Sequence, residues 1–199
     1  QPPTPRRAIA KLGPRACPRF QNKPSEAPTH FGQPAFLNAR DAQSAAVLAM
    51  DGYHLDDRIL NERGWRAKKG APHTFDVAGF AQMLARLRRN EEDEIAVPVF
   101  DRNIEIARNS ARIITRSVRH LIVEGNYLLL DAPPWSTLGS LFDTTVFLNV
   151  PLKTLQERLA SRWKDLSEDD RTIKLEENDL PNARLVRTEG IPEGAGQRD

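Results

Sequence analysis

The sequence predicts an α/β fold in which a largely parallel sheet is flanked by helices. Short apolar runs rich in β-branched residues recur along the chain, and segments with helical periodicity separate them. Two of these runs end in a carboxylate, at Asp51 and Glu124, and parallel sheets handle substrates at the carboxyl ends of their strands. A chain of 199 residues is long enough for one globular domain with a substantial core.

Residues 1–43 are predicted to be an irregular, basic, proline-rich segment. Residues 1–40 contain seven Lys or Arg against one acid, which gives +6, and eight of the fifteen prolines. Proline removes a backbone donor and biases the preceding residue away from the helical region, so we expect no long helix here. A disordered basic tail explains this composition best. A nucleic-acid-binding arm is less favoured, because the basic residues are scattered and lack an aromatic platform.

The predicted α/β unit covers residues 44–186. Its first apolar run, residues 44–50, predicts a buried strand, and the polar segment 51–57 predicts a turn. Asp76 predicts the N-cap of an amphipathic helix over residues 77–90, because apolar residues recur there at helical spacing. The further predicted elements are a short helix at 58–63, strands at 95–100, 120–123 and 144–150, a helix at 152–163, and an irregular tail at 187–199.

Composition excludes several classes of protein. The chain is 39% hydrophobic and 28% charged with a net charge of +2, which favours neither a nucleic-acid partner nor a membrane surface. The single Cys17 excludes an intramolecular disulfide, and the four histidines lack metal-ligand spacing. No apolar run approaches the roughly 20 residues needed to span a bilayer, and the N-terminus lacks a signal-peptide core. We therefore expect a cytoplasmic protein.

The acids at the two strand ends, together with a basic helix, form a pattern that phosphoryl transfer uses. One carboxylate can accept the proton of a substrate hydroxyl, and another can hold Mg²⁺. Arg158 and Arg162 lie one turn apart on the predicted helix and could neutralise charge on a transferring phosphoryl group. The plainer alternative is that the acids cap helices and the arginines coat a solvated helix face.

A family resemblance extends this interpretation. Eight motifs follow one another in the order and spacing of the uridine kinase and phosphoribulokinase group of P-loop kinases. They are MDGYHLDD, KGAPHTFD, PVFDRNIEIAR, LIVEGNYLLL, DAPPW, FLNVP, ERLASRW and ENDLPNARLV. The chain most resembles the bacterial branch described as nucleoside kinase-like, pantothenate kinase-like or fructose-transport-associated kinases. The resemblance covers about residues 46–186 and implies a P-loop NTPase-like sheet.

The resemblance also implies roles for individual residues. Asp51 would be the general base on the substrate hydroxyl, and Glu124 would bind Mg²⁺ directly or through water. Arg158 and Arg162 would lie on a lid-type helix that closes over the nucleotide phosphates. The implied substrate-binding residues are Tyr53, His54, Phe75, Asp76, Asp101 and Arg102. A structural, hydrogen-bonded role is the alternative for His54.

The implied cofactors are ATP and Mg²⁺, and the implied partner is a small molecule with a hydroxyl group, such as a sugar, a nucleoside or a pantothenate-like alcohol. Uridine kinases have a histidine that helps to read the pyrimidine at the position of Glu105. This difference favours a sugar or another polyol-like alcohol over a pyrimidine nucleoside. A homodimer is a candidate assembly. A motif typical of the branch also contains Asn178, Asp179 and Asn182, to which we assign no role from the sequence.

The chain departs from the family at the first strand and the phosphate loop: residues 6–26, RRAIAKLGPRACPRFQNKPSE, start like the family's first strand and glycine and then diverge into proline and arginine. The motif GxxxxGK[ST], whose backbone donors and lysine cradle the nucleotide phosphates, occurs nowhere in the 199 residues. Lys23 cannot replace its lysine, because no glycine-rich turn precedes Lys23. We therefore expect little or no kinase activity, and the alternative function is a non-catalytic remnant or small-molecule-binding protein of the same fold. A compensated frameshift across codons 11–37 would explain the loss. That hypothesis fails if no alternative reading frame there encodes the loop.

Overall fold

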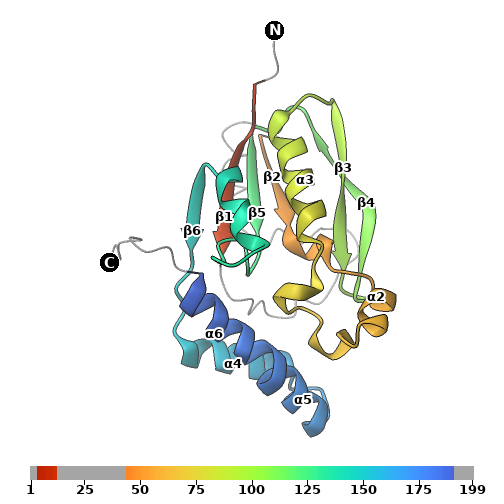
Figure 1. Cartoon of the computed structure of the whole chain (residues 1–199), viewed down its shortest axis with the longest axis vertical. Coiled ribbons are helices and arrows are strands. Elements are labelled where there is room, and N and C mark those ends of the chain that lie inside the picture. Colours follow the sequence, from red (N-terminus) through yellow and green to blue (C-terminus); the bar gives the residue numbers. More distant parts are fainter. Residues whose placement is uncertain (1–3, 13–43, 191–199) are drawn as a thin grey trace.

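The structure is a computed structural model that describes residues 4–12 and 44–190. The predictions made for residues 1–3, 13–43 and 191–199 lie outside the described residues. Four strands form a parallel sheet in the order β2-β5-β1-β6, and two more form a separate antiparallel pair, β3-β4 (Figure 1). The predicted α/β class and the parallel sheet are confirmed.

The parallel sheet is built from short, largely apolar strands, as expected for strands that are covered on both faces. Its strands are β1 (Arg7–Leu12), β2 (Ala45–Ala49), β5 (His120–Glu124) and β6 (Thr144–Phe147). The register of β2 and β5 places Ala49 beside Glu124. The chain that follows β2 and the chain that follows β5 therefore leave the sheet side by side at its carboxyl edge.

Strand β1 corrects the prediction that residues 1–43 are irregular. Ala8 and Ala10 are fully buried, and β1 pairs with both β5 and β6, so residues 7–12 belong to the sheet. The preceding residue, Arg6, is 1% exposed. Its guanidinium donates hydrogen bonds at 2.7 to 2.9 Å to three backbone carbonyls, those of Leu87, Thr115 and Val118. These partners are distant in sequence, so local composition does not reveal them.

Helix α3 (Val77–Arg89) covers one face of the sheet (Figure 1). Its apolar face buries Phe80, Leu84 and Leu87 completely. The side chain of Asp76 accepts a hydrogen bond from the Gly79 backbone N–H at 2.8 Å, which confirms the predicted N-cap. The helix ends at Asn90, whose φ of 55° is left-handed, as is common for a residue that stops a helix.

The antiparallel pair differs from the predicted arrangement. Strand β3 (Glu94–Asp101) occurs where a strand was predicted, but it pairs with β4 (Ile106–Thr115), which was not predicted, in a sheet apart from the parallel one. Residues 108–113 of β4 are all exposed. A strand exposed on both faces lacks the alternation of apolar and polar residues by which strands are recognised, and this explains the omission.

The C-terminal helices lie across the carboxyl end of the parallel sheet (Figure 1). They are α4 (Leu152–Arg162), α5 (Glu168–Lys174), a π-helical turn (Leu175–Asp179) and α6 (Leu180–Glu189). Helix α6 runs three residues past the predicted end of the unit at 186, and β6 stops three residues before the predicted residue 150. Among residues 4–12 and 44–190, no helix combines the length and the apolar character that crossing a bilayer requires.

The remaining elements connect the sheet to the site. They are helix α2 (Asp57–Glu62) and four 3-10 helices, at Met50–Tyr53, Arg66–Lys68, Pro72–Thr74 and Trp135–Leu141. The last of these contributes Trp135 and Leu138 to the same hydrophobic core as α3.

Candidate functional site

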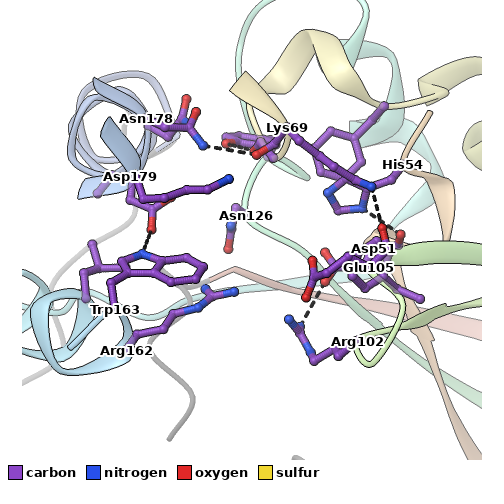
Figure 2. A pocket seen from close by; sticks show the side chains of 18 of the residues that line it. Asp51, His54, Lys69, Arg102, Glu105, Asn126, Arg162, Trp163, Asn178 and Asp179 are labelled. Atoms are coloured by element: carbon purple, nitrogen blue, oxygen red, sulfur yellow. Dashed lines mark hydrogen bonds and ion pairs between the residues drawn. The ribbon is translucent and has the colours of Figure 1, made fainter. Parts of the chain in front are cut away.

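A cavity of about 320 Å³ lies at the carboxyl end of the parallel sheet. The chain segments after β2 and β5 line one side of it, and residues 66–75 and the β3–β4 turn line another. Residues of α4, the π-helical turn and α6 close it from the opposite side (Figure 2). Its volume is at the lower end of the range for small-molecule sites, about 300 to 1,000 Å³.

Asp51 is the buried carboxylate of this cavity. It lies in the 3-10 turn directly after β2, is 3% exposed, and forms an ion pair with Arg102 (Oδ2 to Nη2, 3.1 Å). The neighbouring Gly52 leaves no room for a side chain, because a Cβ there would lie 2.8 Å from the Pro98 carbonyl oxygen. The turn therefore packs directly on β3, the strand that leads to Arg102, and the ion pair joins two elements that already touch.

Half of the predicted site residues meet in the cavity. Its lining includes Asp51, His54, Phe75, Arg102 and Arg162 (Figure 2 labels all but Phe75). His54 also has the structural role named as its alternative, because its Nδ1 donates to the Asp51 backbone carbonyl at 2.8 Å. The side chain of Arg162 comes from the end of α4 and lies on the opposite side from Asp51.

The other predicted residues lie outside the lining of the cavity. Tyr53 belongs to the hydrophobic core, where burial and the charge of Asp76 raise the pKa of its hydroxyl. Asp76 caps α3, and Asp101 pairs with Arg108 at 3.1 Å within the β3–β4 hairpin. The last two predicted residues outside the lining are Glu124, at the end of β5, and Arg158, which is exposed on α4.

Three rings form what we call the aromatic wall: His54, Phe75 and Phe100. The ring centroids of His54 and Phe75 are 4.1 Å apart, and those of His54 and Phe100 are 4.7 Å apart. All three residues line the cavity. Phe75 is held from behind by edge contacts to Tyr127 and Trp135, at 5.8 and 5.7 Å. The wall is therefore a fixed apolar surface close to Asp51.

Lys69 is a cavity residue that sequence reasoning missed. Its side chain is 7% exposed and lies 2.5 Å from the Asp57 carboxylate, and its Nζ also donates to the Glu105 backbone carbonyl. Arg66 contacts the same carboxylate at 3.0 Å. Burial raises the pKa of Asp57, but Lys69 and Arg66 outweigh that effect and hold the pKa below its usual value. The motif KGAPHTFD, which begins with Lys69, was the available signal.

The motif ENDLPNARLV, residues 177–186, lies in the π-helical turn and in α6. Asn178 is 4% exposed and lies in the π-helical turn, and its Nδ2 donates to the Lys69 backbone carbonyl at 3.1 Å (Figure 2). Asn182 donates to Oδ1 of Asn178 at 3.0 Å. A π-turn shifts the phase of a helix by one residue and is frequent at functional sites. Here it lies where the C-terminal helices meet the cavity.

Asp179, next in the chain, also faces the cavity. Its Oδ2 accepts a hydrogen bond from the indole Nε1–H of Trp163 at 2.8 Å (Figure 2). Burial raises the pKa of Asp179, while the Trp163 hydrogen bond and the charges of Arg162 and Lys174 oppose that rise. This wall of the cavity therefore carries two cations around one partly buried carboxylate.

The described residues offer few ligands for a metal ion. Within residues 4–12 and 44–190, no group of three or more His, Cys, Asp or Glu side chains could hold one. Glu124 is the last residue of β5, and Asp51 lies in the 3-10 turn directly after the neighbouring strand β2. Because Mg²⁺ is commonly held by one or two carboxylates together with substrate phosphates, Glu124 fits such a site only in the company of a nucleotide.

Known kinases are among the proteins that this chain resembles. No family model matches the chain. The crystal structure of a "putative fructose transport system kinase" from Silicibacter sp. TM1040 aligns with 94% of this chain and 87% of its own, with a TM-score of 0.80 and 35% identity. The "Uncharacterized protein YggC" of Escherichia coli is 37% identical over 129 residues, which are 64% of this chain. The "Putative uridine kinase C227.14" of Schizosaccharomyces pombe is 31% identical over 148 residues, which are 70% of this chain.

The chain spans 52% of the length of the first of these two curated relatives and 63% of the second. The likeness to the Silicibacter structure, in contrast, extends over most of both chains at 35% identity. The chain therefore belongs to the P-loop kinases of the uridine kinase type.

Proposed function

We propose that this protein is an ATP-dependent phosphotransferase that acts on a hydroxyl of a small molecule, with Asp51 as the general base and with its activity impaired by the lack of GxxxxGK[ST] in the sequence. The position of Asp51 supports the proposal. It is a buried, ion-paired carboxylate at the carboxyl end of a parallel strand, and it faces a cavity sized for a small acceptor.

In this reaction the Asp51 side of the cavity would act on the acceptor, and the Arg162 side would act on the transferring phosphoryl group. Arg102 holds the carboxylate of Asp51 through their ion pair at 3.1 Å, and this carboxylate would accept the proton of the acceptor hydroxyl. The acceptor oxygen then bonds to the γ-phosphorus as the bond to the bridging oxygen of ADP breaks. Arg162, on the opposite wall, stabilises the charge on the transferring group.

The remaining predicted residues divide by their position. His54, Phe75 and Arg102 contact the acceptor in this proposal, because they line the cavity with Asp51. Arg158, one turn before Arg162, would reach the nucleotide from outside the cavity. Glu124 would hold Mg²⁺ together with the nucleotide phosphates, and the ion would neutralise part of the phosphate charge.

A second candidate function rests on a specific observation, the absence of GxxxxGK[ST] from the sequence. That loop supplies backbone donors and a lysine to the nucleotide phosphates, so its loss removes much of the ATP affinity while it leaves the acceptor cavity intact. A non-catalytic protein that still binds the small molecule would have these properties.

Titration with Mg-ATP, followed by a phosphate-transfer assay with D-fructose and uridine, separates the two functions. Micromolar ATP binding with transfer supports the kinase and contradicts the non-catalytic protein. Absence of ATP binding contradicts the kinase. If transfer occurs, Asp51→Asn should reduce it by about 10²- to 10⁴-fold, the usual contribution of a general base, while acceptor binding persists. Transfer by Asp51→Asn at the wild-type rate would remove Asp51 from this role.

A further inference from the structure

The side chains of Arg162 and Trp163 stack on each other at the wall of the cavity. Cζ of Arg162 lies 4.6 Å from the centroid of the Trp163 ring, a distance typical of a cation–π contact. Both residues line the cavity, and Figure 2 shows the guanidinium beside the ring and directed towards the side that carries Asp51. The indole therefore lies against the cation that faces Asp51 across the cavity.

This stack depends on where helix α4 ends. Consecutive residues of a continuing helix point about 100° apart, so neighbours in sequence do not face each other. Arg162 is the last residue of α4, and Trp163 is its C-cap, with φ of −103° and ψ of 13°. The backbone thus leaves the helical path at Trp163, which allows the ring to turn back onto the side chain before it.

Asp179 fixes the polar edge of the indole. Its Oδ2 accepts a hydrogen bond from Nε1–H of Trp163 at 2.8 Å, across 16 residues of sequence. Nε1–H is the single polar donor of an indole, so this directional bond sets the orientation of the ring. Asp179 lies in the π-helical turn, next to the residue that bonds the Lys69 carbonyl. The ring is therefore held between the end of α4 and the π-helical turn.

Orientation matters for Arg162 because its side chain is long and exposed. Ordering such a side chain when a ligand binds lowers the affinity by about two- to tenfold. A ring that is itself fixed restricts the arginine before the ligand arrives, and the loss on binding is then smaller. The stack is not the only interaction of Arg162, since the charge of Asp179 also acts on it.

The stack also keeps a geometry that suits a phosphoryl group. An aromatic ring contacts the flat face of a guanidinium, whereas the five N–H donors lie in the plane at its edge. These donors match pairs of phosphoryl oxygens in spacing and direction. Trp163 can therefore orient Arg162 without competing for the donors that a phosphoryl group uses.

Packing is the plainer role for Trp163, and two other tryptophans help to judge it. Trp135 is 2% exposed and belongs to the hydrophobic core, whereas Trp163 is only partly buried and is not among the described residues of that core. Trp65 also stacks on an arginine, Arg63, at 5.0 Å, but lies outside the cavity lining. Trp65 is therefore a matched control for a stack that has no part in the site.

We propose that Trp163 and Asp179 are positioning residues for Arg162: Asp179 fixes the indole, and the indole holds the guanidinium towards the transferring phosphoryl group. Neither residue touches the reacting atoms. This inference rests on the proposed function, because it describes how the same site orients an arginine that acts in that reaction. It also gives a role to Asp179, to which the sequence assigned none.

Calorimetric titration of the full chain with inorganic tripolyphosphate tests the proposal without phosphate transfer. Trp163→Leu should weaken binding by about three- to tenfold, because it removes the ring that orders the arginine. Trp65→Leu should leave the affinity unchanged. In an Arg162→Met background, Trp163→Leu should have no further effect, because the ring acts through the arginine, and a purely structural ring would give additive losses.

Two neutral substitutions of Asp179 separate its charge from its hydrogen bond. Asp179→Asn keeps an oxygen that can accept from Trp163, whereas Asp179→Ala does not. Both remove the same charge, so the attraction for a polyphosphate changes equally in the two. We expect Asp179→Ala to bind tripolyphosphate about two- to fivefold more weakly than Asp179→Asn. Circular dichroism checks that each variant folds, and this pair decides the question if Trp163→Leu does not fold.

Several results would overturn the inference. They are unchanged affinity in Trp163→Leu, equal losses in Trp163→Leu and Trp65→Leu, additive losses in the double variant, and equal affinities of Asp179→Asn and Asp179→Ala. Failure of the wild type to bind tripolyphosphate would overturn it as well. The expected pattern of affinities without transfer from Mg-ATP would support it while contradicting the kinase function. Transfer by Trp163→Leu at the wild-type rate and with unchanged affinity would overturn it while the kinase function stands.

Discussion

Nδ2 of Asn178 donates a hydrogen bond to the backbone carbonyl of Lys69 at 3.1 Å, across 109 residues of sequence. The bond joins the C-terminal helices to the segment that forms the wall beside Asp51. The side chain of the same lysine is bound by Asp57 and by the Glu105 carbonyl. Lys69 is thus the point at which the C-terminal helices, α2 and the β3–β4 turn meet, and this junction holds the wall that carries Arg162 opposite Asp51.

Asn178→Ala should destabilise the protein by about 1 to 3 kcal/mol, because it leaves the partly buried Lys69 carbonyl and the Asn182 amide without the Asn178 side chain as their partner. Denaturant unfolding monitored by circular dichroism measures the change. Glu177→Ala is the matched control on the same turn, since its pair with Lys68 is exposed and should contribute less than about 1 kcal/mol. Equal losses in the two variants would contradict the junction.

Arg6→Met should cost about 3 kcal/mol of unfolding free energy. The variant keeps an apolar stem but leaves three carbonyls, at Leu87, Thr115 and Val118, without the charged donor that they share. Arg7→Met, at the neighbouring exposed position, should stay within about 0.5 kcal/mol of the wild type. The two midpoints in guanidinium chloride give the comparison, and a stable Arg6→Met protein would show that β1 does not depend on these bonds.

Gly125→Ala should destabilise the carboxyl edge of the sheet. A Cβ at position 125 would lie 2.7 Å from Cβ and 2.8 Å from Sδ of Met50, so the chain segments after β2 and β5 would have to move apart. Overpacking of this kind costs about 1 to 3 kcal/mol. Gly139→Ala is the control, because a Cβ there meets nothing within 4 Å. A thermal midpoint of Gly125→Ala equal to that of the control would be incompatible with this close packing.

Asp179 predicts a specific pH dependence. Because its pKa is raised in the folded protein, the folded state binds this proton more tightly than the unfolded state does. Its contribution to stability is therefore complete below the unfolded pKa and is lost as the pH rises through the higher folded pKa. Asp179→Asn keeps an oxygen that can accept from Trp163 but cannot ionise. It should remove this decline and be more stable than the wild type at neutral pH.

Thermal unfolding of the wild type and of Asp179→Asn, measured from about pH 3 to pH 8, tests this prediction. Asp143→Asn serves as a comparison of opposite sign. Burial raises the pKa of Asp143, but hydrogen bonds from the Ala8 N–H and from Arg88 lower it further than burial raises it. Its contribution is present above the unfolded pKa and is lost as the pH falls. A wild-type profile that Asp179→Asn leaves unchanged would refute the raised pKa.

Local signals in the sequence led to most of the elements that frame the site. Asp76 and the helical spacing of the apolar residues after it were sufficient to predict α3, because an N-cap and an amphipathic stripe depend only on residues close in sequence. Strand β4 was missed, and β1, whose start resembles the family's first strand, was assigned to an irregular segment, for opposite reasons. The exposed residues of β4 have no alternation, and the proline-rich surroundings of β1 conceal a strand whose partners β5 and β6 lie more than 100 residues away.

By itself, the sequence determined the class of fold, the family through the order of its motifs, and the presence of a carboxylate at the end of a strand. Each of these depends on residue order and short-range periodicity. Only the tertiary structure decided which residues share the cavity. It placed Lys69 and Asn178 inside and left Tyr53, Asp76 and Asp101 outside. The physical reason is that hydrogen bonds and ion pairs such as Asn178 to Lys69 or Asp51 to Arg102 form between distant segments, and only packing brings those segments together.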